Sequence, residues 1–247
     1  MLMERLKLTI SYDGTFFSGY QVQQNQRTVQ SEIEKALQKM HKTRIKIYSS
    51  GRTDSQVHAL GQVIHFDTPL QLGEQHWLNA LMTLLPDDIQ IVTVEKVDSS
   101  FHARIDAVKK TYRYIVLNDQ KKDIFNRHYE WHVPRDLNVE KMQRAAELIV
   151  GTHDFSAFCA SKTNVIGNKT RTIYRLDVWK EQHRVYFEIT GNGFLTHMVR
   201  IIVGTLVEIG LGKKTESCIS DAFLTLKRQH LGMTAPGHGL YLKEVSY

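Results

Sequence analysis

Cysteine is scarce in this chain, and the two that occur, Cys159 and Cys218, stand alone. They form no Cys-x-x-Cys pair and no Cys/His spacing suited to zinc. Long apolar runs are missing too, since none approaches the roughly 20 residues that a membrane-spanning helix needs. These absences argue against a zinc module and a membrane span, and we expect a cytoplasmic protein with reduced thiols.

Recognisable metal-binding patterns are also missing. The 12 histidines include no His-Glu-x-x-His and no His-x-His, so each is expected to be an ordinary polar residue rather than a ligand. No short-period repeat and no low-complexity tract occurs. What remains is 42% hydrophobic and 23% charged residues, a composition typical of a soluble protein with a packed core.

The first hundred residues alternate strand and helix patterns. Strands are predicted at residues 7–12, 44–48, 62–66 and 89–97, and helices at 29–40, after a Thr28 cap, and at 77–85, before Pro86. This βαββαβ order indicates an antiparallel or mixed sheet with helices on one face.

The second half uses the same elements with different lengths. Strands are predicted at residues 112–117, 171–179, 184–190 and 240–245, and helices at 138–150, 194–209 and 215–228. We therefore expect an α+β fold of two halves, residues 1–103 and 104–247, each with a mixed or antiparallel sheet. A cleft between the halves is the default place for a site.

The formal net charge of +6 is unevenly distributed. Residues 1–103 hold 10 Lys and Arg against 11 Asp and Glu, whereas residues 104–247 hold 22 against 15. A net charge of this size can serve solubility alone. A basic half also favours a polyanionic partner, because neutralising phosphates drives most nucleic-acid affinity. Charge by itself leaves both interpretations open.

Residues 51–63 place one carboxylate, Asp54, in a polar loop between two predicted strands, with Arg52 two residues before it. In an extended stretch, side chains at i and i+2 lie on one face, so the acid and the cation are expected to be neighbours. A loop of this kind is how a fold presents a reactive carboxylate. The alternative is a structural Arg–Asp pair that pins the loop.

A second acid close to Asp54 would suggest a glycoside hydrolase. The next carboxylate along the chain is Asp67, on the far side of a predicted strand. Glycoside hydrolases need two carboxylates that flank the scissile bond, so the pattern disfavours that class. A lone aspartate suits nucleophilic attack or proton abstraction.

Residues 109–114 interleave aromatic and basic side chains on a predicted strand. Tyr112 and Tyr114 share one face, and Arg113 lies on the other. Such a strand can stack a base while it holds a phosphate. The alternative is a half-buried strand whose tyrosines belong to the core. The preceding segment adds an aromatic ring, an imidazole and a guanidinium: Phe101, His102 and Arg104.

Two glycine-containing segments suggest nucleotide-binding loops but lack key residues. Residues 191–200 join a strand to a helix, yet Thr196 stands where the third glycine of a dinucleotide-binding fold should be. Residues 210–215 fail as a phosphate loop, because Val207 and Lys214 occupy the places of Gly and Ser/Thr. Neither segment predicts a nucleotide cofactor.

Arg200 is a charge about one turn into an otherwise very apolar predicted helix. A guanidinium there either extends its stem to reach water or pairs with a buried anion. Asp54 is the attractive candidate for that anion.

Six short motifs follow one another along the chain. They are Gly-Tyr-Gln-Val-Gln at 19–23, Gly-Arg-Thr-Asp with Val-His and Gly-Gln-Val at 51–63, Phe-His-Ala-Arg at 101–104, Tyr-Arg-Tyr at 112–114, His-Met-Val-Arg with Val-Gly at 197–204, and Thr-Ala-Pro with Gly-Leu-Tyr-Leu at 234–242. Together they resemble the TruA family, the tRNA pseudouridine synthases A. Chance agreement at one motif is easy, but ordered agreement from end to end is not.

The resemblance implies an isomerase that converts uridine to pseudouridine in the anticodon stem-loop of tRNA, at positions 38 to 40, without cofactor or metal. It also implies a homodimer of two α+β halves, with a catalytic cleft between the halves and tRNA as partner. By motif, Asp54 is the catalytic nucleophile or base, and Arg200 pairs with it. Arg52 helps to extrude the target base, and Tyr112 stacks on that base. The remaining substrate-binding residues expected by motif are Gln21, His58, Phe101, His102 and Arg104.

One pair of residues departs from the family pattern. Ser55 and Gln56 stand where the family usually has Ala-Gly after the aspartate. If the backbone there is left-handed, Gln56 costs about 1–2 kcal/mol or forces another loop path. Two alternatives to an active synthase therefore stay open: a non-catalytic tRNA- or RNA-binding paralogue of the same fold, and another uridine- or glycoside-acting enzyme, which the lack of a paired acid disfavours.

Overall fold

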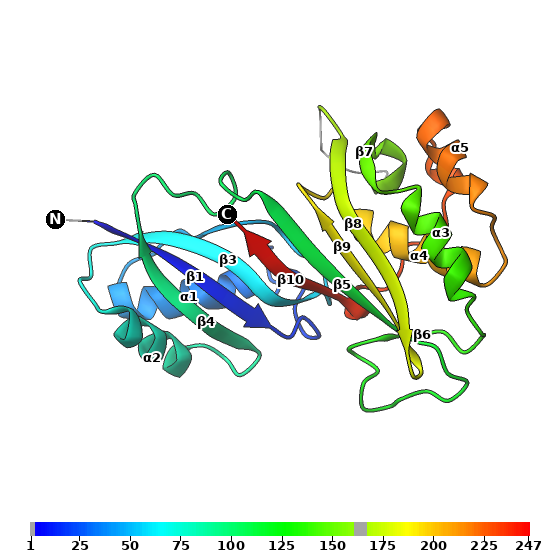
Figure 1. The fold of residues 1–247 in the computed structure, drawn as a ribbon. Coiled ribbons are helices and arrows are strands. Elements are labelled where there is room, and N and C mark those ends of the chain that lie inside the picture. Colours follow the sequence, from blue (N-terminus) through cyan, green and yellow to red (C-terminus); the bar gives the residue numbers. More distant parts are fainter. Residues whose placement is uncertain (1–2, 161–166) are drawn as a thin grey trace. The chain divides into compact units, whose positions relative to one another are not determined.

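The computed structural model describes residues 3–160 and 167–247, and within it the chain forms two compact units. The first consists of Met1–Val108 with Tyr241–Tyr247, and the second of Lys109–Leu240. Each unit combines a sheet with helices (Figure 1), so the predicted α+β class is confirmed.

The first unit is built on a mixed sheet with the strand order β4-β1-β3-β10. These strands are β4 (Ile89–Val97), β1 (Glu4–Tyr12), β3 (His58–Thr68) and β10 (Leu240–Ser246). β1 pairs antiparallel with both β3 and β4, whereas β10 joins β3 in parallel. The two-residue strand β2 (Tyr48–Ser49) pairs antiparallel with β3 at His65 and Ile64.

Two helices cover the apolar face of this sheet, α1 (Val29–His41) and α2 (Glu74–Leu84). Alternate β1 residues are fully or nearly buried, while their neighbours stay half-buried, so one face carries the core. Thr28 caps α1 in a capping box, in which Thr28 Oγ1 accepts the Ser31 N–H and Ser31 Oγ accepts the Thr28 N–H. α2 ends just before Pro86, as its sequence predicts.

The second unit is built on an antiparallel sheet with the strand order β5-β9-β8-β7. These strands are β5 (Lys109–Leu117), β9 (Arg184–Gly191), β8 (Thr170–Glu181) and β7 (Gly151–Asp154). A short strand, β6 (Trp131–His132), runs parallel to β5. Every second side chain of β9 is buried, so one face of this strand belongs to the core of the second unit.

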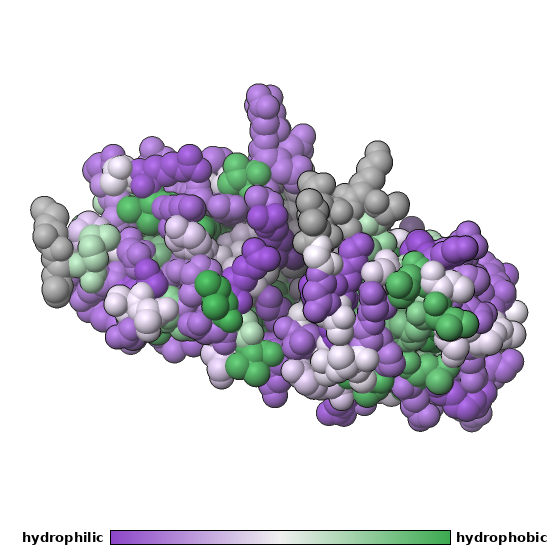
Figure 2. All heavy atoms as spheres, turned by 90° about the horizontal axis from the view of Figure 1, so that it is seen from above, coloured by the Kyte–Doolittle hydropathy of each residue, from purple (hydrophilic) through white to green (hydrophobic). Residues whose placement is uncertain are grey.

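Three helices belong to the second unit: α3 (Val139–Glu147), α4 (Met198–Gly210) and α5 (Ser217–Thr225). α4 is buried along almost its whole length, and α3 packs on both α4 and β8. Short 3-10 turns lie at Ser156–Phe158, Arg228–His230 and Gly237–Gly239. Figure 2 shows apolar side chains gathered among hydrophilic ones at the α5 end of this unit, where Leu224 and Leu226 are exposed.

Three element predictions need correction, and the strand β7 was missed. The strand predicted at residues 44–48 is wrong over most of its length, because Ile47 is a single buried anchor between exposed residues. β3 begins at His58, not at residue 62, since β10 pairs with it at His58 and Ala59. α4 begins only at Met198, after a left-handed His197. β7 was not predicted, because none of its side chains is buried.

No helix in the described part of the chain is long and apolar enough to cross a membrane.

Candidate active site

The loop that carries Asp54 connects β2 to β3 and contains one tight turn. The Val57 N–H donates to the Asp54 carbonyl oxygen at 3.2 Å, which closes a four-residue turn. Gln56, the third residue of that turn, has φ of 63°, a left-handed conformation that glycine usually supplies. The loop backbone therefore has a conformation that suits glycine, and the side chain of Gln56 makes that conformation strained.

The residue before Asp54 is fixed on both sides. The Thr53 Oγ1 hydroxyl shares a hydrogen bond of 2.8 Å with the Tyr12 hydroxyl, and the Tyr20 N–H donates to the Thr53 carbonyl oxygen at 3.1 Å. Burial raises the pKa of Tyr12 to about 12, so this phenol stays protonated at neutral pH. The Gln62 amide also donates to the Gly51 carbonyl oxygen at 3.1 Å. Three segments of the first unit thus set the position of the loop.

Glycines allow a neighbouring segment to lie directly against the loop. A Cβ added to Gly14 would lie 2.1 Å from the Val57 carbonyl oxygen, and one added to Gly19 would lie 2.9 Å from the Thr53 carbonyl oxygen. Gly19 also has φ of 94°. Backbone-to-backbone packing of this kind admits no side chain, so residues 14–19 form a rigid support beneath Asp54.

His58 is a buried part of this support. Its side chain is 2% exposed, and its ring stacks on Tyr241 with centroids 4.7 Å apart. Nδ1 lies 2.9 Å from the Gly14 N–H and 3.2 Å from an Asp13 oxygen. Because Nδ1 accepts the Gly14 N–H, it carries no proton that it could donate to Asp13. His58 therefore joins β3, the Gly14 turn and β10.

The other predicted residues of the loop region are more open. Asp54 is half-buried, whereas Arg52 and Gln21 are exposed. Gln21 follows directly after Tyr20, the residue that is hydrogen-bonded to Thr53. The structure thus brings Asp54, Arg52, Gln21 and His58 to one end of the first unit, with His58 beneath the surface.

The segment that contains Phe101, His102 and Arg104 lies elsewhere in the first unit. The Ala103 N–H donates to Nδ1 of His65 at 3.1 Å, and His65 is seven residues beyond His58 on β3, roughly 23 Å of strand. Nδ1 of His102 accepts the Arg104 N–H at 3.1 Å, which folds the segment back on itself. The Arg104 side chain is exposed. The first unit does not bring this segment to the Asp54 loop.

His65 itself is an unusual group. It is 1% exposed, and burial lowers its pKa from 6.5 to about 4, with the nearby charges of Arg5 and His102 acting in the same direction. Its ring stacks on Tyr48 with centroids 5.0 Å apart. His65 is therefore neutral in the folded protein near pH 7.

Tyr112 lies on β5 in the second unit, in register with Ile189 of β9. Its side chain is 9% exposed, and its ring meets the Phe194 ring edge to face with centroids 5.0 Å apart. Phe194 belongs to the segment that leads into α4. Tyr114, on the same face, is fully buried and donates its hydroxyl hydrogen to the Pro236 carbonyl oxygen at 2.8 Å. Tyr114 is thus a core residue, whereas Tyr112 lies at the edge of the core.

Arg200 lies in the first turn of α4 and is oriented by the chain near Ala235. Its Nε donates to the Ala235 carbonyl oxygen at 2.7 Å, and the Ala235 N–H donates back to the Arg200 carbonyl oxygen at 3.0 Å. A Cβ added to Gly204 would lie 1.9 Å from the Met233 carbonyl oxygen, so residues 233–235 run directly against the helix. This double anchor fixes the direction in which the guanidinium leaves α4.

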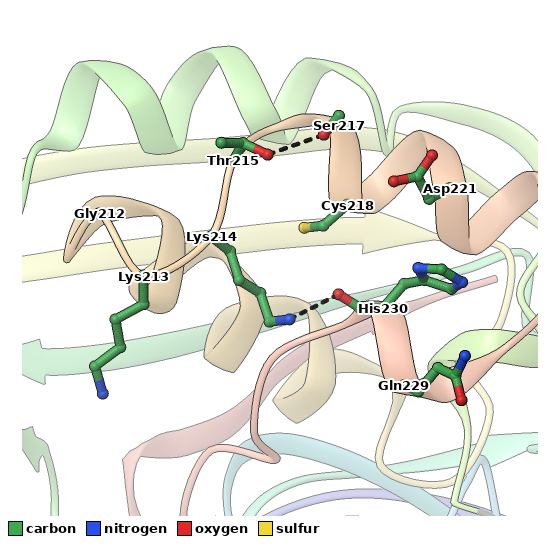
Figure 3. Close-up of a pocket in the computed structure, with 9 residues that line it drawn as sticks. All are labelled: Gly212, Lys213, Lys214, Thr215, Ser217, Cys218, Asp221, Gln229 and His230. Carbon is green, nitrogen blue, oxygen red and sulfur yellow. Dashed lines mark hydrogen bonds between the residues drawn. The ribbon is translucent and has the colours of Figure 1, made fainter.

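A cavity of about 380 Å³ in the second unit lies next to α5 (Figure 3). The segment of residues 212–215 forms one wall, but Lys214 Nζ donates to the His230 carbonyl oxygen at 3.0 Å, and Lys213 points away in the figure. Burial raises the pKa of the Cys218 thiol, which points into the cavity. None of the predicted site residues lines this cavity. The cavity lies between residues 212–215, α5 and the 3-10 turn at Arg228–His230, and it is not the candidate active site.

Apart from His58, which was expected to bind substrate, the support residues were not predicted from the sequence. Gly14 and Gly19 were the available signal, because glycines close to a polar loop can mark close backbone approach. Phe194 lay inside the segment that was compared with dinucleotide-binding loops, and its contact with Tyr112 depends on strand pairing that a single sequence does not reveal.

Together these features define an α+β protein with one carboxylate on a rigidly held loop and an aromatic residue and a guanidinium on regular elements. A family model described as tRNA pseudouridine synthase matches residues 8–106 and 145–247. Relatives named tRNA pseudouridine synthase A in Bacillus velezensis and in Bacillus subtilis (strain 168) are each 54% identical over 245 residues, covering 98% of this chain and 99% of the relative. One named tRNA pseudouridine synthase A 1 in Bacillus cereus is 52% identical over 246 residues, which cover 99% of both chains. The chain belongs to the tRNA pseudouridine synthase family.

Proposed function

We propose that this protein is a tRNA pseudouridine synthase that isomerises uridine to pseudouridine at positions 38 to 40 of the anticodon stem-loop. The observation that carries the proposal is the Asp54 loop, which is held by Tyr12, Tyr20 and Gln62 in a chain 54% identical to curated synthases. The reaction breaks the N1–C1′ bond, forms a C5–C1′ bond, moves a proton to N1 and releases the C5 hydrogen to solvent.

Asp54 is the catalytic residue in this proposal. Its carboxylate either adds covalently to the nucleoside or takes a proton from the ribose. Arg200 neutralises the carboxylate charge as the reaction proceeds. The double anchor on Ala235 supports this role, because a guanidinium held in one direction loses little entropy when it pairs.

The target base must leave its stack before it can react. Extruding a paired base costs a few kcal/mol, which Arg52 and Tyr112 offset in this proposal. Arg52 is exposed and fills the place of the extruded base. Tyr112 stacks on the uracil and keeps it in place once the glycosidic bond is broken. Support comes from Phe194, whose edge contact fixes the plane of the Tyr112 ring.

The remaining predicted residues divide by exposure. Gln21 and Arg104 are exposed and bind the RNA directly in this proposal, together with half-buried Phe101 and His102. His58 acts on substrate binding indirectly, by supporting the loop, because its side chain is buried under Tyr241. The Arg104→Ala variant keeps Asp54, so it should bind tRNA more weakly but turn over at the wild-type rate when tRNA is saturating.

The proposed activity also implies an assembly and a compartment. We propose a homodimer that acts in the cytoplasm on tRNA. Light scattering of the purified protein tests the dimer, since a mass of one 28.6 kDa chain at micromolar concentration would refute it.

Tritium release from tRNA labelled at uridine C5 tests the activity. We expect the wild-type protein to release tritium, and a tRNA with cytidine at positions 38 to 40 to release none. Absence of release from the labelled tRNA would overturn the proposal and leave a binding protein of the same fold. The left-handed Gln56 already favours activity over that alternative, because the loop keeps the path that the family glycine would give it.

A further inference from the structure

The loop between β5 and β6, residues 118–130, carries an exposed aromatic residue at its tip. Phe125 is 82% exposed and its neighbour Ile124 is 59% exposed. Figure 1 shows this loop extending beyond the ends of β5, β8 and β9 in the second unit. The family model leaves residues 107–144 unmatched, and the proposed function assigns no role to the loop.

The base of the loop is fixed by a buried asparagine. Asn118 is 4% exposed, and its amide donates to the carbonyl oxygens of Val133 and Arg135 at 3.1 and 2.8 Å. Its own N–H donates to the His183 carbonyl oxygen in the β8–β9 turn at 2.7 Å. The loop therefore starts from a rigid point at the edge of the sheet.

The acidic residues of the loop are used to hold its shape. Asp123 accepts the N–H groups of Phe125 and Asn126 at 2.9 and 3.1 Å, which folds the tip. Arg184 of β9 bonds Glu130 at 2.6 Å and Asp123 at 3.4 Å, and Glu130 is only 5% exposed. A third acid, Asp119, accepts the Lys121 N–H at 2.8 Å. Glu130 is thus buried, and the part-exposed Asp119 and Asp123 are bonded within the loop or to Arg184.

The basic residues of the loop are exposed, and Arg127 Nη1 donates to the Ile124 carbonyl oxygen at the tip. Lys121, Lys122 and Arg127 are all exposed. Within the described part of the chain, neither lysine ammonium donates a hydrogen bond or forms an ion pair. An isolated exposed Phe needs no explanation. Here, however, an internally bonded loop presents an aromatic ring between cations in a unit where Lys and Arg outnumber Asp and Glu by 20 to 13.

We propose that the β5–β6 loop is a second RNA-binding element, in which Phe125 stacks on an unpaired nucleotide and Lys121 and Lys122 bind the adjacent phosphates. An aromatic face beside cations is the combination that single-stranded RNA requires. The identification of that RNA as tRNA rests on the proposed function. A docking protein is the other possible occupant, but the exposed lysines favour phosphates.

The loop acts on affinity rather than on chemistry. Tyr112 and Leu117 are five residues apart on β5, about 17 Å of strand, and Phe125 lies beyond that end. A contact at this distance binds a nucleotide away from the target uridine. Loss of the contact therefore raises the tRNA concentration needed for half-saturation and leaves turnover at saturation unchanged.

Filter binding of tRNA to the full-length protein tests the inference. Phe125→Ala should raise Kd about tenfold, the usual cost of one lost stacking contact, and Phe125→Trp should restore it. Lys121→Ala/Lys122→Ala should flatten the dependence of log Kd on log salt by about 1.4 to 1.8. Leu224→Ala, at an 85% exposed apolar position on α5, and Lys141→Ala/Lys227→Ala are the matched controls and should bind as the wild type does.

Each result is decided by binding, so it can be separated from catalysis. If Phe125→Ala binds like Leu224→Ala, the proposal is overturned. It is overturned equally if Phe125→Ala weakens binding only by changing the oligomeric mass in light scattering, which would make the tip a protein contact. A wild type that binds tRNA with a Phe125-dependent Kd yet releases no tritium would refute the proposed function and leave this inference intact.

Discussion

In the first unit the predicted carboxylate lies on a loop without regular structure, whereas in the second unit Tyr112 lies on a strand and Arg200 on a helix. The loop is positioned by hydrogen bonds to Tyr12 and Tyr20 and by glycines that let another backbone touch it. The strand and helix are regular elements, to which the Phe194 contact at Tyr112 and the two Ala235 bonds at Arg200 are added. A reactive group on a loop therefore depends on more of its surroundings than one on a regular element.

The units differ in charge as well. The first holds 12 Lys and Arg against 13 Asp and Glu, and the second holds 20 against 13. The unit that carries the carboxylate is therefore nearly neutral, and the unit that carries the aromatic platform is basic. Phosphate binding is expected to depend mainly on the second unit.

Substituting the close-contact glycines gives the largest expected effect on stability. Gly14→Ala would place a Cβ 2.1 Å from the Val57 carbonyl oxygen, and Gly204→Ala one 1.9 Å from the Met233 carbonyl oxygen. Each should lower the unfolding free energy by about 3 kcal/mol or more, because backbone cannot yield as a side chain does. Urea unfolding measures this, with Gly73→Ala, whose nearest contact is 3.5 Å away, as control.

For Gly14→Ala we also expect an effect on activity. Any folded Gly14→Ala protein should lose tritium release while it still binds tRNA, since only the loop is displaced. A Gly14→Ala protein with wild-type stability and activity would show that the backbone contact does not position Asp54.

Arg200→Ala should lower turnover by about 10²-fold, with less than a threefold change in tRNA Kd, because the guanidinium acts on the carboxylate charge and not on the phosphates. Arg200→Lys should recover only part of the turnover, since a lysine lacks the Nε that bonds Ala235. Single-turnover tritium release and filter binding separate the two effects. A defect in affinity alone would contradict the role given to Arg200.

His65 makes the first unit sensitive to acid. Its folded pKa of about 4 lies below the ordinary value of 6.5, so the unfolded chain binds more protons between these values and stability falls as pH drops from about 6.5 to 4. His65→Asn keeps an acceptor for the Ala103 N–H and removes this titration. Urea unfolding at pH 7 and pH 4.5 should show a smaller loss for the variant, whereas equal losses would rule out His65 as a source.

Gln56→Gly should have the smallest effect. Relief of the left-handed conformation at φ of 63° should stabilise the protein by up to about 1 kcal/mol. Gln182→Gly, at φ of 52° in the β8–β9 turn, is the matched control for stability in the second unit. A loss of stability at position 56 alone would mean that the glutamine side chain, and not only the backbone, holds the turn.

Local signals predicted much of the fold. The Thr28 cap, the strand at residues 89–97 and the stop at Pro86 each depend on neighbours in sequence, and each was confirmed. The start of β3 was wrong because it depends on β10, which pairs with it from the other end of the chain. The strand at residues 44–48 was wrong because Ile45 and Ile47 alternate with polar residues in sequence, although only Ile47 is buried.

The site shows the same division. Asp54, Tyr112 and Arg200 came from motifs in the sequence, and their roles remain predictions. The sequence did not reveal that Gly14 and Tyr20 hold the loop, that Phe194 contacts Tyr112, or that Ala235 anchors Arg200. All of these contacts join residues distant in sequence, and their partners are ordinary residue types.

Single-turnover tritium release by Asp54→Asn at saturating tRNA tests the central claim most directly. Asp67→Asn, which breaks the surface pair with Arg5 in the same unit, serves as the matched control and should retain release. We expect Asp54→Asn to bind tRNA as the wild type does and to lose release by about 10³-fold or more. Release by Asp54→Asn at the wild-type rate would contradict the assignment of Asp54 as the catalytic residue.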